Sequence, residues 1–471
     1  MTTSVCRFEG HDHARCSDGE GQTWENPTPG AALVRADAVA LPFGDETVDL
    51  VVTSPPYFAL RSYTDGGEHY EGQIGSEPTP REFLEALWAV MAECWRVLKP
   101  SGSVFVNLGD KRAGSGGHNN ANLSRLHETD GRRIKDRDRR ADDGHRMVGA
   151  TRRQAPNRYN QESGGVPAKS LMGTPWRFAL GCTDGLAAPD GRQWILREDL
   201  IWSKPNGLPE SVKDRCRQSH EYWFHFTKRG RYFADMDVIR EPHIHAANGS
   251  VFGGKKAIGA DAGLSNTYGN NTYDNLNPLG KLPDSVWRIP TQPLIVPDEL
   301  GVDHFAAFPT EWPRRLIAAF CPEHICTVCG EGRKSVGERV GGVINQGAGE
   351  RAVARMGGQQ TGGTERSTLG GGNAARIITG TACACPDTSA PSKPGVVLDP
   401  FGGTGTTAMV ARALGRFGVS MDLSSDYLRL ANWRVFESDG AERVRARHEG
   451  REFKPPKPEA EGQLSLLDVA P

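Results

Sequence analysis

Two short segments carry residue types that could do chemistry. The first reads TSPPY, Thr53–Tyr57, and directly follows the apolar run Val48–Thr53. A proline pair before an aromatic ring makes a stiff loop that turns backbone carbonyl oxygens outward, and the Ser54 hydroxyl adds another hydrogen-bond acceptor. The plain alternative is a proline-rich end to a strand.

The second segment, LDPFGGTGTT, spans Leu398–Thr407 and predicts a strand, a glycine-rich turn and a helix. Glycines allow a tight turn and let a ligand approach the backbone N–H groups at a helix start. The segment lacks the lysine of a phosphate-binding P-loop. Asp422 ends the next predicted strand, where a carboxylate would accept hydrogen bonds from ribose hydroxyls. An ordinary glycine-rich turn is the alternative.

Four cysteines form two close pairs, Cys326–Cys329 and Cys383–Cys385, around a glycine-rich stretch. This spacing resembles a small zinc ribbon, in which four thiolates close a structural site. Since the stretch between the pairs is too poor in apolar residues to build a core, a metal would have a clear purpose. Free buried thiols are the alternative. Because the pairs lie outside the two segments described above, a structural role is expected more than a catalytic one.

Strands that alternate with helices predict an α/β fold with a parallel, doubly wound sheet. Thr79, Pro80 and Glu82 predict a helix start with a capping box, and Pro100–Gly102 predicts its end. Further strands are expected over residues 103–110, 199–204, 222–233, 395–399 and 417–422. The strands that precede Ser54 and Asp399 should be neighbours, which would bring both loops to one edge.

Taken together, these segments resemble the DNA amino-methyltransferases that depend on S-adenosylmethionine, in the permuted type whose SPPY loop precedes the cofactor motif. The resemblance extends to VRADAVALPFGDETVDLVVTSPPY, RVLKPSGSVFVNLGD, DLIWSKPN, SHEYWFHFTK, HFAAFPTEWPRRLI, VLDPFGGTGTT and GVSMD. It implies a mostly parallel, seven-stranded Rossmann-like methyltransferase sheet with circularly permuted motif order. It also implies an inserted recognition module. The chain departs from the family at Asp422, where glutamate is more frequent, and in two long insertions.

The resemblance assigns the chemistry to Ser54–Tyr57. The Ser54 hydroxyl and the Pro55 carbonyl would accept the two N–H bonds of an exocyclic amine, and so aim its lone pair at a sulfonium methyl. Pro56 would stiffen the loop, and Tyr57 would stack on the base. Because a paired base cannot reach such a loop, the base is expected to flip out of the duplex.

The resemblance also implies the residues that bind S-adenosylmethionine. Simple core packing is the alternative for the aromatic ring at position 308. The expected cofactor residues are Asp37, Phe308, Pro309, Asp399, Phe401, Gly403, Gly405, Thr406, Thr407 and Asp422.

The absence of a Pro-Cys pair and the form of the SPPY motif limit which atom of a base could be methylated. None of the ten cysteines follows a proline, which argues against a C5-cytosine methyltransferase. The SPPY form favours cytosine N4, and adenine N6 is the runner-up. The rival classes are a catalytically inactive DNA-binding homologue and a methyltransferase that acts on protein or RNA.

The chain is expected to begin with a loose tail. Segments of the methyltransferase domain then alternate with insertions, and a linker and a tail end the chain. The ranges are 1–30 for the tail, 31–110 and 171–240 for the catalytic half, 111–170 for a basic insertion, 241–302 for target recognition, 303–320 for the cofactor-closing segment, 321–390 for the zinc-ribbon-like insertion, 391–445 for the cofactor half and 446–471 for the C-terminal tail.

Composition sets further limits. The chain of 471 residues has a net charge of −2, so contacts with double-stranded DNA must come from local basic patches. The segment 111–153 has 12 Lys or Arg against 6 Asp or Glu, which indicates a disordered insertion, an arm along a phosphate backbone, or both. No membrane span or signal peptide is expected, and the location expected is the cytoplasm.

Two further partners are implied. Gln463–Leu467, in the letters QLSLL, is similar to the short motif by which bacterial proteins dock on the replication sliding clamp. The other candidate partner is a cognate restriction endonuclease, and an orphan enzyme without one is the alternative.

Overall fold

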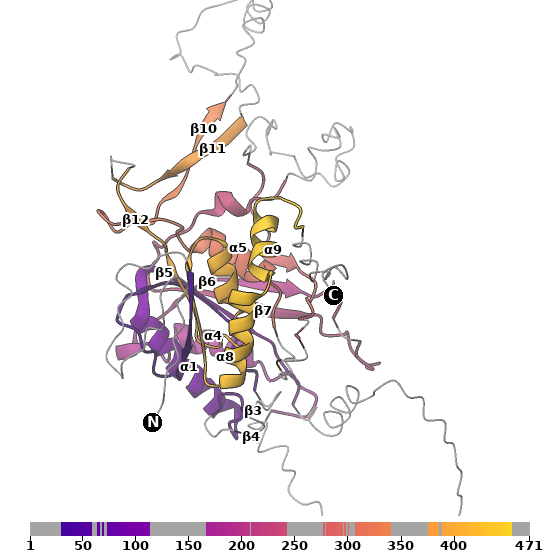
Figure 1. The fold of residues 1–471 in the computed structure, drawn as a ribbon. Coiled ribbons are helices and arrows are strands. Elements are labelled where there is room, and N and C mark those ends of the chain that lie inside the picture. Colours follow the sequence, from indigo (N-terminus) through magenta and orange to yellow (C-terminus); the bar gives the residue numbers. More distant parts are fainter. Residues whose placement is uncertain are drawn as a thin grey trace, which may run out of the picture.

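The fold is a central twisted sheet with helices on both faces (Figure 1). The computed structural model describes residues 30–58, 64–65, 68–69, 73–113, 166–207, 209–242, 277, 279–294, 296–297, 300, 307–340, 375–385 and 389–454. The tail 1–29, most of the basic insertion, most of the predicted recognition module and the clamp-like motif lie outside the described residues.

The main sheet has eight strands. In spatial order they are β1 (Gly30–Arg35), β14 (Phe417–Asp422), β13 (Val396–Asp399), β2 (Val48–Thr53), β5 (Leu98–Leu108), β7 (His220–Thr227), β6 (Ile195–Ser203) and β8 (Val286–Arg288). All neighbours pair in parallel except β7, which is antiparallel to both β5 and β6. The prediction of a mostly parallel, doubly wound sheet is therefore confirmed.

The expected number of seven strands was wrong, because β8 adds an eighth strand at the edge. β8 lies in the predicted recognition module and pairs in parallel with β6, with Trp287 opposite Trp202. The Trp287 ring stacks on Trp312 with centroids 4.7 Å apart. A three-residue strand has no periodicity to detect, and burial of this aromatic ring holds it in place.

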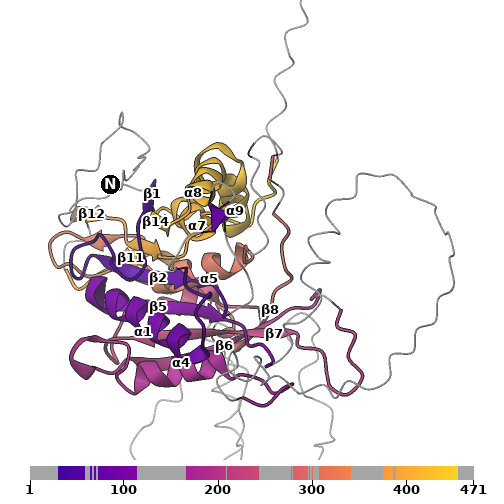
Figure 2. The ribbon, with the colours of Figure 1, turned by 90° about the horizontal axis from the view of Figure 1, so that it is seen from below.

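The helices divide between the two faces, each with its own apolar core (Figure 2). On one face lie α1 (Pro80–Val97) and α4 (Thr174–Thr183). On the other lie α5 (Glu311–Phe320), α7 (Thr406–Ala413), α8 (Ser425–Asn432) and α9 (Gly440–His448). Short 3-10 turns span Pro189–Gly191 and Met236–Ile239, and a π-helical turn spans Trp433–Glu437.

The start of α1 agrees with the sequence, and its end does not. Thr79 caps the Glu82 N–H, and the Glu82 carboxylate accepts from the Thr79 N–H, which confirms the capping box. β5, however, begins at Leu98 and runs through Pro100, which was expected to separate helix from strand. The pairing with β2 is irregular between Val48 and Leu50, and a proline is tolerated at such an irregularity.

Three small ladders complete the fold. They are β3 (Thr64–Asp65) with β4 (Glu68–His69), β9 (Ile325–Cys326) with β12 (Ser392–Lys393), and β10 (Lys334–Val340) with β11 (Ala375–Ala382). Within the described ranges, no helix has the length and hydropathy that crossing a membrane requires.

Candidate active site

The two chemistry-bearing loops meet at one edge of the sheet. β2 and β13 pair directly, with Leu50 opposite Val397 and Val51 opposite Leu398. Both strands are parallel, so Ser54–Tyr57 and the glycine-rich turn leave the sheet at the same carboxyl edge. The expected neighbourhood of these strands is confirmed, and Ser54 and Gly403 lie on the same side of the molecule.

A buried carboxylate joins the two loops. Asp399, 1% exposed, accepts hydrogen bonds from the Thr53 hydroxyl at 2.7 Å, the Thr407 hydroxyl at 2.8 Å and the Phe401 N–H at 3.1 Å. Burial raises the pKa of Asp399 to about 6, although these three donors lower it. Its oxygens therefore hold the Ser54–Tyr57 loop and the glycine-rich turn together.

The glycine turn is tight for steric reasons. A Cβ at Gly402 would lie 1.8 Å from the Ser420 Oγ, and Gly403 and Gly405 have φ values of +49° and +72°. Helix α7 begins after Gly405 without a side-chain cap, so its first-turn N–H groups are open to a ligand.

Asp422 closes this turn from the neighbouring strand. Its carboxylate accepts from the Gly403 N–H at 3.0 Å and from the Ser424 N–H at 2.8 Å. Asp37 lies nearby in the fold, exposed on the loop after β1, whose last residue Arg35 is opposite Asp422. Two carboxylates thus stand at the carboxyl ends of adjacent strands.

Arg434 supports the turn from behind, and sequence reasoning missed this residue. Its guanidinium donates to the hydroxyls of Thr404 and Thr406, the latter at 2.7 Å. Burial lowers the pKa of Arg434 to about 10. Among the described residues no carboxylate pairs with it. A cation is therefore buried directly behind the turn.

The residues just before α5 pack against the sheet. Phe308 and Pro309 are buried, and the Phe308 ring packs edge-on against Trp223 at 5.5 Å. Trp223 is opposite Asn107 on the neighbouring strand. In the described part of the chain, the buried N–H groups of the Trp223 and Trp312 indoles have no partner. The two rings stack on each other with centroids 5.0 Å apart, inside the apolar core between the sheet and α5.

Asn107 holds the Ser54–Tyr57 loop in place. Its Oδ1 accepts from the Ser54 hydroxyl at 3.2 Å and from the Tyr57 hydroxyl at 2.9 Å, while its Nδ2 donates to the Tyr222 carbonyl at 3.0 Å. Because Ser54 donates its only proton here, its lone pairs remain available to accept. A polar residue inside the apolar strand SVFVNL was the signal that sequence reasoning missed.

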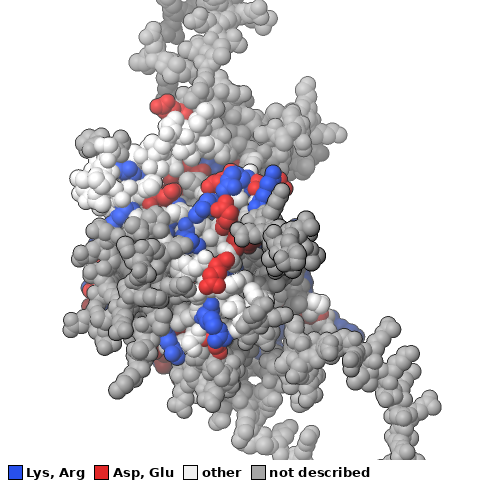
Figure 3. All heavy atoms as spheres, viewed as in Figure 1, with Lys and Arg blue, Asp and Glu red and all other residues white. Residues whose placement is uncertain are grey.

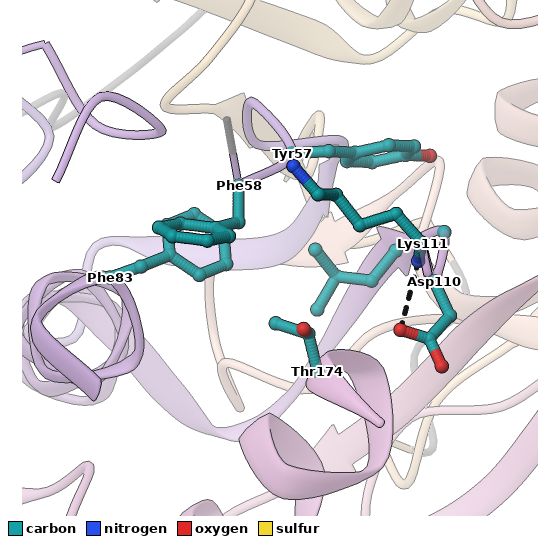
Figure 4. Close-up of a pocket in the computed structure, with 8 residues that line it drawn as sticks. Tyr57, Phe58, Phe83, Asp110, Lys111 and Thr174 are labelled. Atoms are coloured by element: carbon teal, nitrogen blue, oxygen red, sulfur yellow. Dashed lines mark hydrogen bonds between the residues drawn. The ribbon is translucent and has the colours of Figure 1, made fainter. Parts of the chain in front are cut away.

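A small cavity of about 50 Å³ is lined by Tyr57, Phe58 and Lys111, among other residues (Figure 4). The Lys111 side chain extends across it toward Phe58, with its Nζ 5.2 Å from the ring centroid. The Asp110 carboxylate is used locally, since it accepts from the N–H groups of Gly173 and Lys111. The remaining walls are formed by Phe83, Leu108, Gly109 and Thr174.

The four cysteines of the predicted ribbon cluster in space. The Sγ atoms of Cys326, Cys329, Cys383 and Cys385 all lie within 4.8 Å of one another, and those of Cys326 and Cys385 are 3.8 Å apart. Thiolates about 2.3 Å from a tetrahedral zinc ion are separated by about 3.8 Å. Hydrogen bonds from the backbone N–H groups of Cys329 and Val328 lower the pKa of Cys326, while hydrogen bonds with the Cys329 and Cys326 thiols raise the pKa of Cys385.

The cluster lies away from the catalytic edge. β9 pairs with β12, and β12 leads into the amino end of β13. Figure 1 shows β10 and β11 at one end of the molecule and β3 and β4, which follow the Ser54–Tyr57 loop, at the other. The cysteine cluster is therefore close to the glycine-rich turn in sequence but lies away from the carboxyl edge of the sheet, where that turn is found.

The face formed by α8 and α9 carries basic and acidic side chains next to one another (Figure 3). Arg443 pairs with Asp439, and both Arg445 and Arg451 pair with Glu442. Basic side chains on this face are balanced by neighbouring carboxylates, so it offers no strong field for a polyanion.

Comparison with known proteins identifies the family of this chain. The family model described as DNA methylase, for N6 and N4 enzymes, matches residues 48–326 and 388–432, more than half of the chain. The chain is 35% identical over 294 residues to the type II methyltransferase M.XycI of Xanthomonas campestris pv. cyanopsidis, covering 62% of this chain and 72% of that protein. It is 27% identical to M.SmaI of Serratia marcescens over 83% of this chain and 85% of that protein.

Among solved structures, the PvuII DNA methyltransferase, titled cytosine-N4-specific, aligns with a TM-score of 0.43 and 16% identity, covering 92% of this chain and 98% of that one. The family model spans both loops and the strands that position them. The chain therefore belongs to the N6/N4 DNA methylase family and is a DNA amino-methyltransferase.

Proposed function

We propose that this enzyme methylates the N4 amine of cytosine flipped out of duplex DNA. The observation that carries the proposal is the Ser54 hydroxyl, which donates to Asn107 at the edge shared with the cofactor turn. A serine oriented in this way presents lone pairs to an incoming amine. The alternative target is adenine N6, and the family includes enzymes of both kinds.

The catalytic loop then works by position and electrostatics. Ser54 Oγ and the Pro55 carbonyl accept the two N–H bonds of the amine, so its lone pair points out of the base plane. Pro56 restricts the backbone, and the Tyr57 ring stacks on the base. The proton lost from the amine leaves to solvent, because Asn107 is a neutral amide that does not take it.

S-adenosylmethionine supplies the electrophilic methyl when it is bound. Asp422 and Asp37 would accept from the ribose and adenine end, while Gly403, Gly405 and the α7 N-terminus would cradle the nucleoside. Phe308 and Pro309 would lie near the methionine moiety. Phe401 forms part of the turn, and Thr406 and Thr407 open the helix behind it. Asp399 acts chiefly through the loops that its oxygens join.

Zinc is the metal that suits the cysteine cluster. Four thiols and a 3.8 Å Sγ separation match a closed tetrahedral site, which has no open position for catalysis. We assign it the structural role of holding the 321–390 insertion to the sheet.

To identify the methylated base, the chain is expressed in a host that lacks DNA modification, and the genome of that host is sequenced by single-molecule kinetics. N4-methylcytosine at one short sequence is expected. N6-methyladenine would establish the alternative. An unmodified genome, together with no label transfer to duplex DNA in vitro, would identify an inactive homologue.

DNA contacts beyond the loop are assigned to the basic segment 111–153 and to the module 241–302. A cognate restriction endonuclease is proposed as a partner in the cell, since the relatives are named type II methyltransferases.

The sliding clamp is the second proposed partner, through Gln463–Leu467. Deleting 462–471 should abolish retention on immobilised clamp and leave methylation of short duplexes unchanged. Equal retention of the deleted and full chains would refute this contact.

A further inference from the structure

Tyr57 has a second hydrogen-bond acceptor that the proposed chemistry does not use. Its hydroxyl lies 2.9 Å from Glu221 Oε2, as close as it lies to Asn107 Oδ1. The hydroxyl carries one proton, so the two acceptors share it. A carboxylate is the stronger acceptor of the two, because charge-assisted hydrogen bonds are shorter and stronger than neutral ones.

Glu221 is itself held in place. Its other oxygen, Oε1, pairs with the Lys204 ammonium, and the Glu221 and Lys204 side chains are only 17% and 20% exposed. The Lys204 Nζ lies 4.1 Å from the centroid of the Trp202 ring. Trp202 and Glu221 face each other across β6 and β7, so the pair is anchored in the sheet.

The ring of Tyr57 is confined as well as its hydroxyl. A Cβ at Gly109 would lie 2.8 Å from Tyr57 Cε2 and 3.3 Å from Glu221 Cγ. The ring therefore packs against bare backbone, with Glu221 beside it. Two strands and one loop converge on a single tyrosine before any base arrives.

We infer that Glu221, charged and fixed by Lys204, is a positioning residue that sets the Tyr57 ring as a platform for the flipped base. This inference rests on the proposed function, in which Tyr57 stacks on the target. Glu221 touches neither base nor cofactor. It acts through the tyrosine hydroxyl. Because the ring is already fixed, binding of the base does not carry the entropy cost of ordering the Tyr57 side chain.

A double-mutant cycle tests this route of action. Steady-state transfer of labelled methyl to unmodified genomic DNA is measured for wild type, Glu221→Ala, Tyr57→Phe and the double variant. Glu221→Ala should lower kcat about tenfold, the effect of losing one charge-assisted hydrogen bond. In the Tyr57→Phe background the same change should cost less than twofold, since the hydroxyl through which Glu221 acts is gone. Equal losses in both backgrounds would overturn the inference.

Two variants serve as comparisons. Glu221→Gln keeps an acceptor for Tyr57 and should recover much of the lost rate. Glu85→Ala removes one partner of the exposed Arg81–Glu85 pair on α1 and should leave kcat unchanged. Thermal unfolding midpoints show whether each variant is folded.

A spectroscopic measurement keeps the inference separate from the proposed function. In protein labelled with 3-fluorotyrosine, the Tyr57 fluorine signal is identified by its loss in Tyr57→Phe. Glu221→Ala should shift this signal and Glu85→Ala should not. An unmoved signal would refute the contact, whether or not the chain methylates DNA. Absence of methyl transfer by wild type would instead count against the proposed function.

Discussion

Thr53 donates a hydrogen bond of 2.7 Å to Asp399, although the two residues are 346 positions apart in the chain. Thr407 donates to the other oxygen of the same carboxylate at 2.8 Å. One buried side chain thus links the strand before the catalytic loop to the helix after the cofactor turn. Changes at this link should affect both loops together.

Asp399 should make stability depend on pH. Its pKa is raised to about 6 by burial, against about 3.9 in an unfolded chain. The folded state therefore holds the proton more tightly, and this contribution is complete below about pH 4 and lost as pH rises through about 6. Between pH 5 and pH 8 it amounts to about 1.4 kcal/mol.

Asp399→Asn removes that contribution. Urea unfolding at pH 5 and pH 8 should show a drop in the free energy of unfolding that is larger in wild type than in Asp399→Asn by about this amount. An identical pH dependence in the two proteins would contradict the assignment.

Ser54→Ala should separate chemistry from binding. Without the hydroxyl, the amine loses one of two acceptors, and kcat should fall on the order of 100-fold. Cofactor affinity, measured by calorimetry, should stay within twofold. Ser101→Ala, exposed toward the other end of β5, is the matched control and should retain wild-type turnover. Normal turnover in Ser54→Ala would end its catalytic assignment.

Gly402→Ala should damage the cofactor turn by steric conflict alone. The new Cβ would lie 1.8 Å from the Ser420 Oγ, so the turn or the strand must shift. We expect cofactor affinity to fall at least about tenfold, with a loss of stability of about 1–3 kcal/mol. Gly230→Ala is the control, because no atom lies within 4 Å of its Cβ position. Similar affinities in both variants would show that the turn is not tight.

Cys326→Ser should remove zinc and leave the chemistry intact. Mass spectrometry should find one zinc ion per wild-type chain and none in this variant, and the unfolding temperature should fall. Turnover per folded molecule should change less than twofold, because the cluster lies away from the catalytic edge. Cys216→Ser, an exposed cysteine outside the cluster, is the control. A zinc-free wild type of full stability would refute the site.

Local patterns predicted much of this fold. The run Val48–Thr53 is fully buried and became β2, and FGVSMD became β14 at the expected residues. The capping box at Thr79 forms because both of its hydrogen bonds are local. The adjacency of β2 and β13 followed from the rule that parallel strands place their functional loops at one edge.

Other features had no local signature. Asn107 and Glu221 act on the catalytic loop only because β5 and β7 are neighbours, a relation no single segment encodes. β8 is three residues long and depends on aromatic packing across the sheet. The position of the cysteine cluster depends on the pairing of β9 with β12, which the sequence around the cysteines does not reveal.

The strand order also determines when the enzyme becomes competent. β13 and β14 lie inside the sheet but are synthesised last, and β1, made first, has only β14 beside it. A nascent polypeptide that ends before residue 396 on the ribosome thus carries a serine loop with no donor pocket next to it. The two loops can therefore form one site only after the final strands have emerged from the exit tunnel.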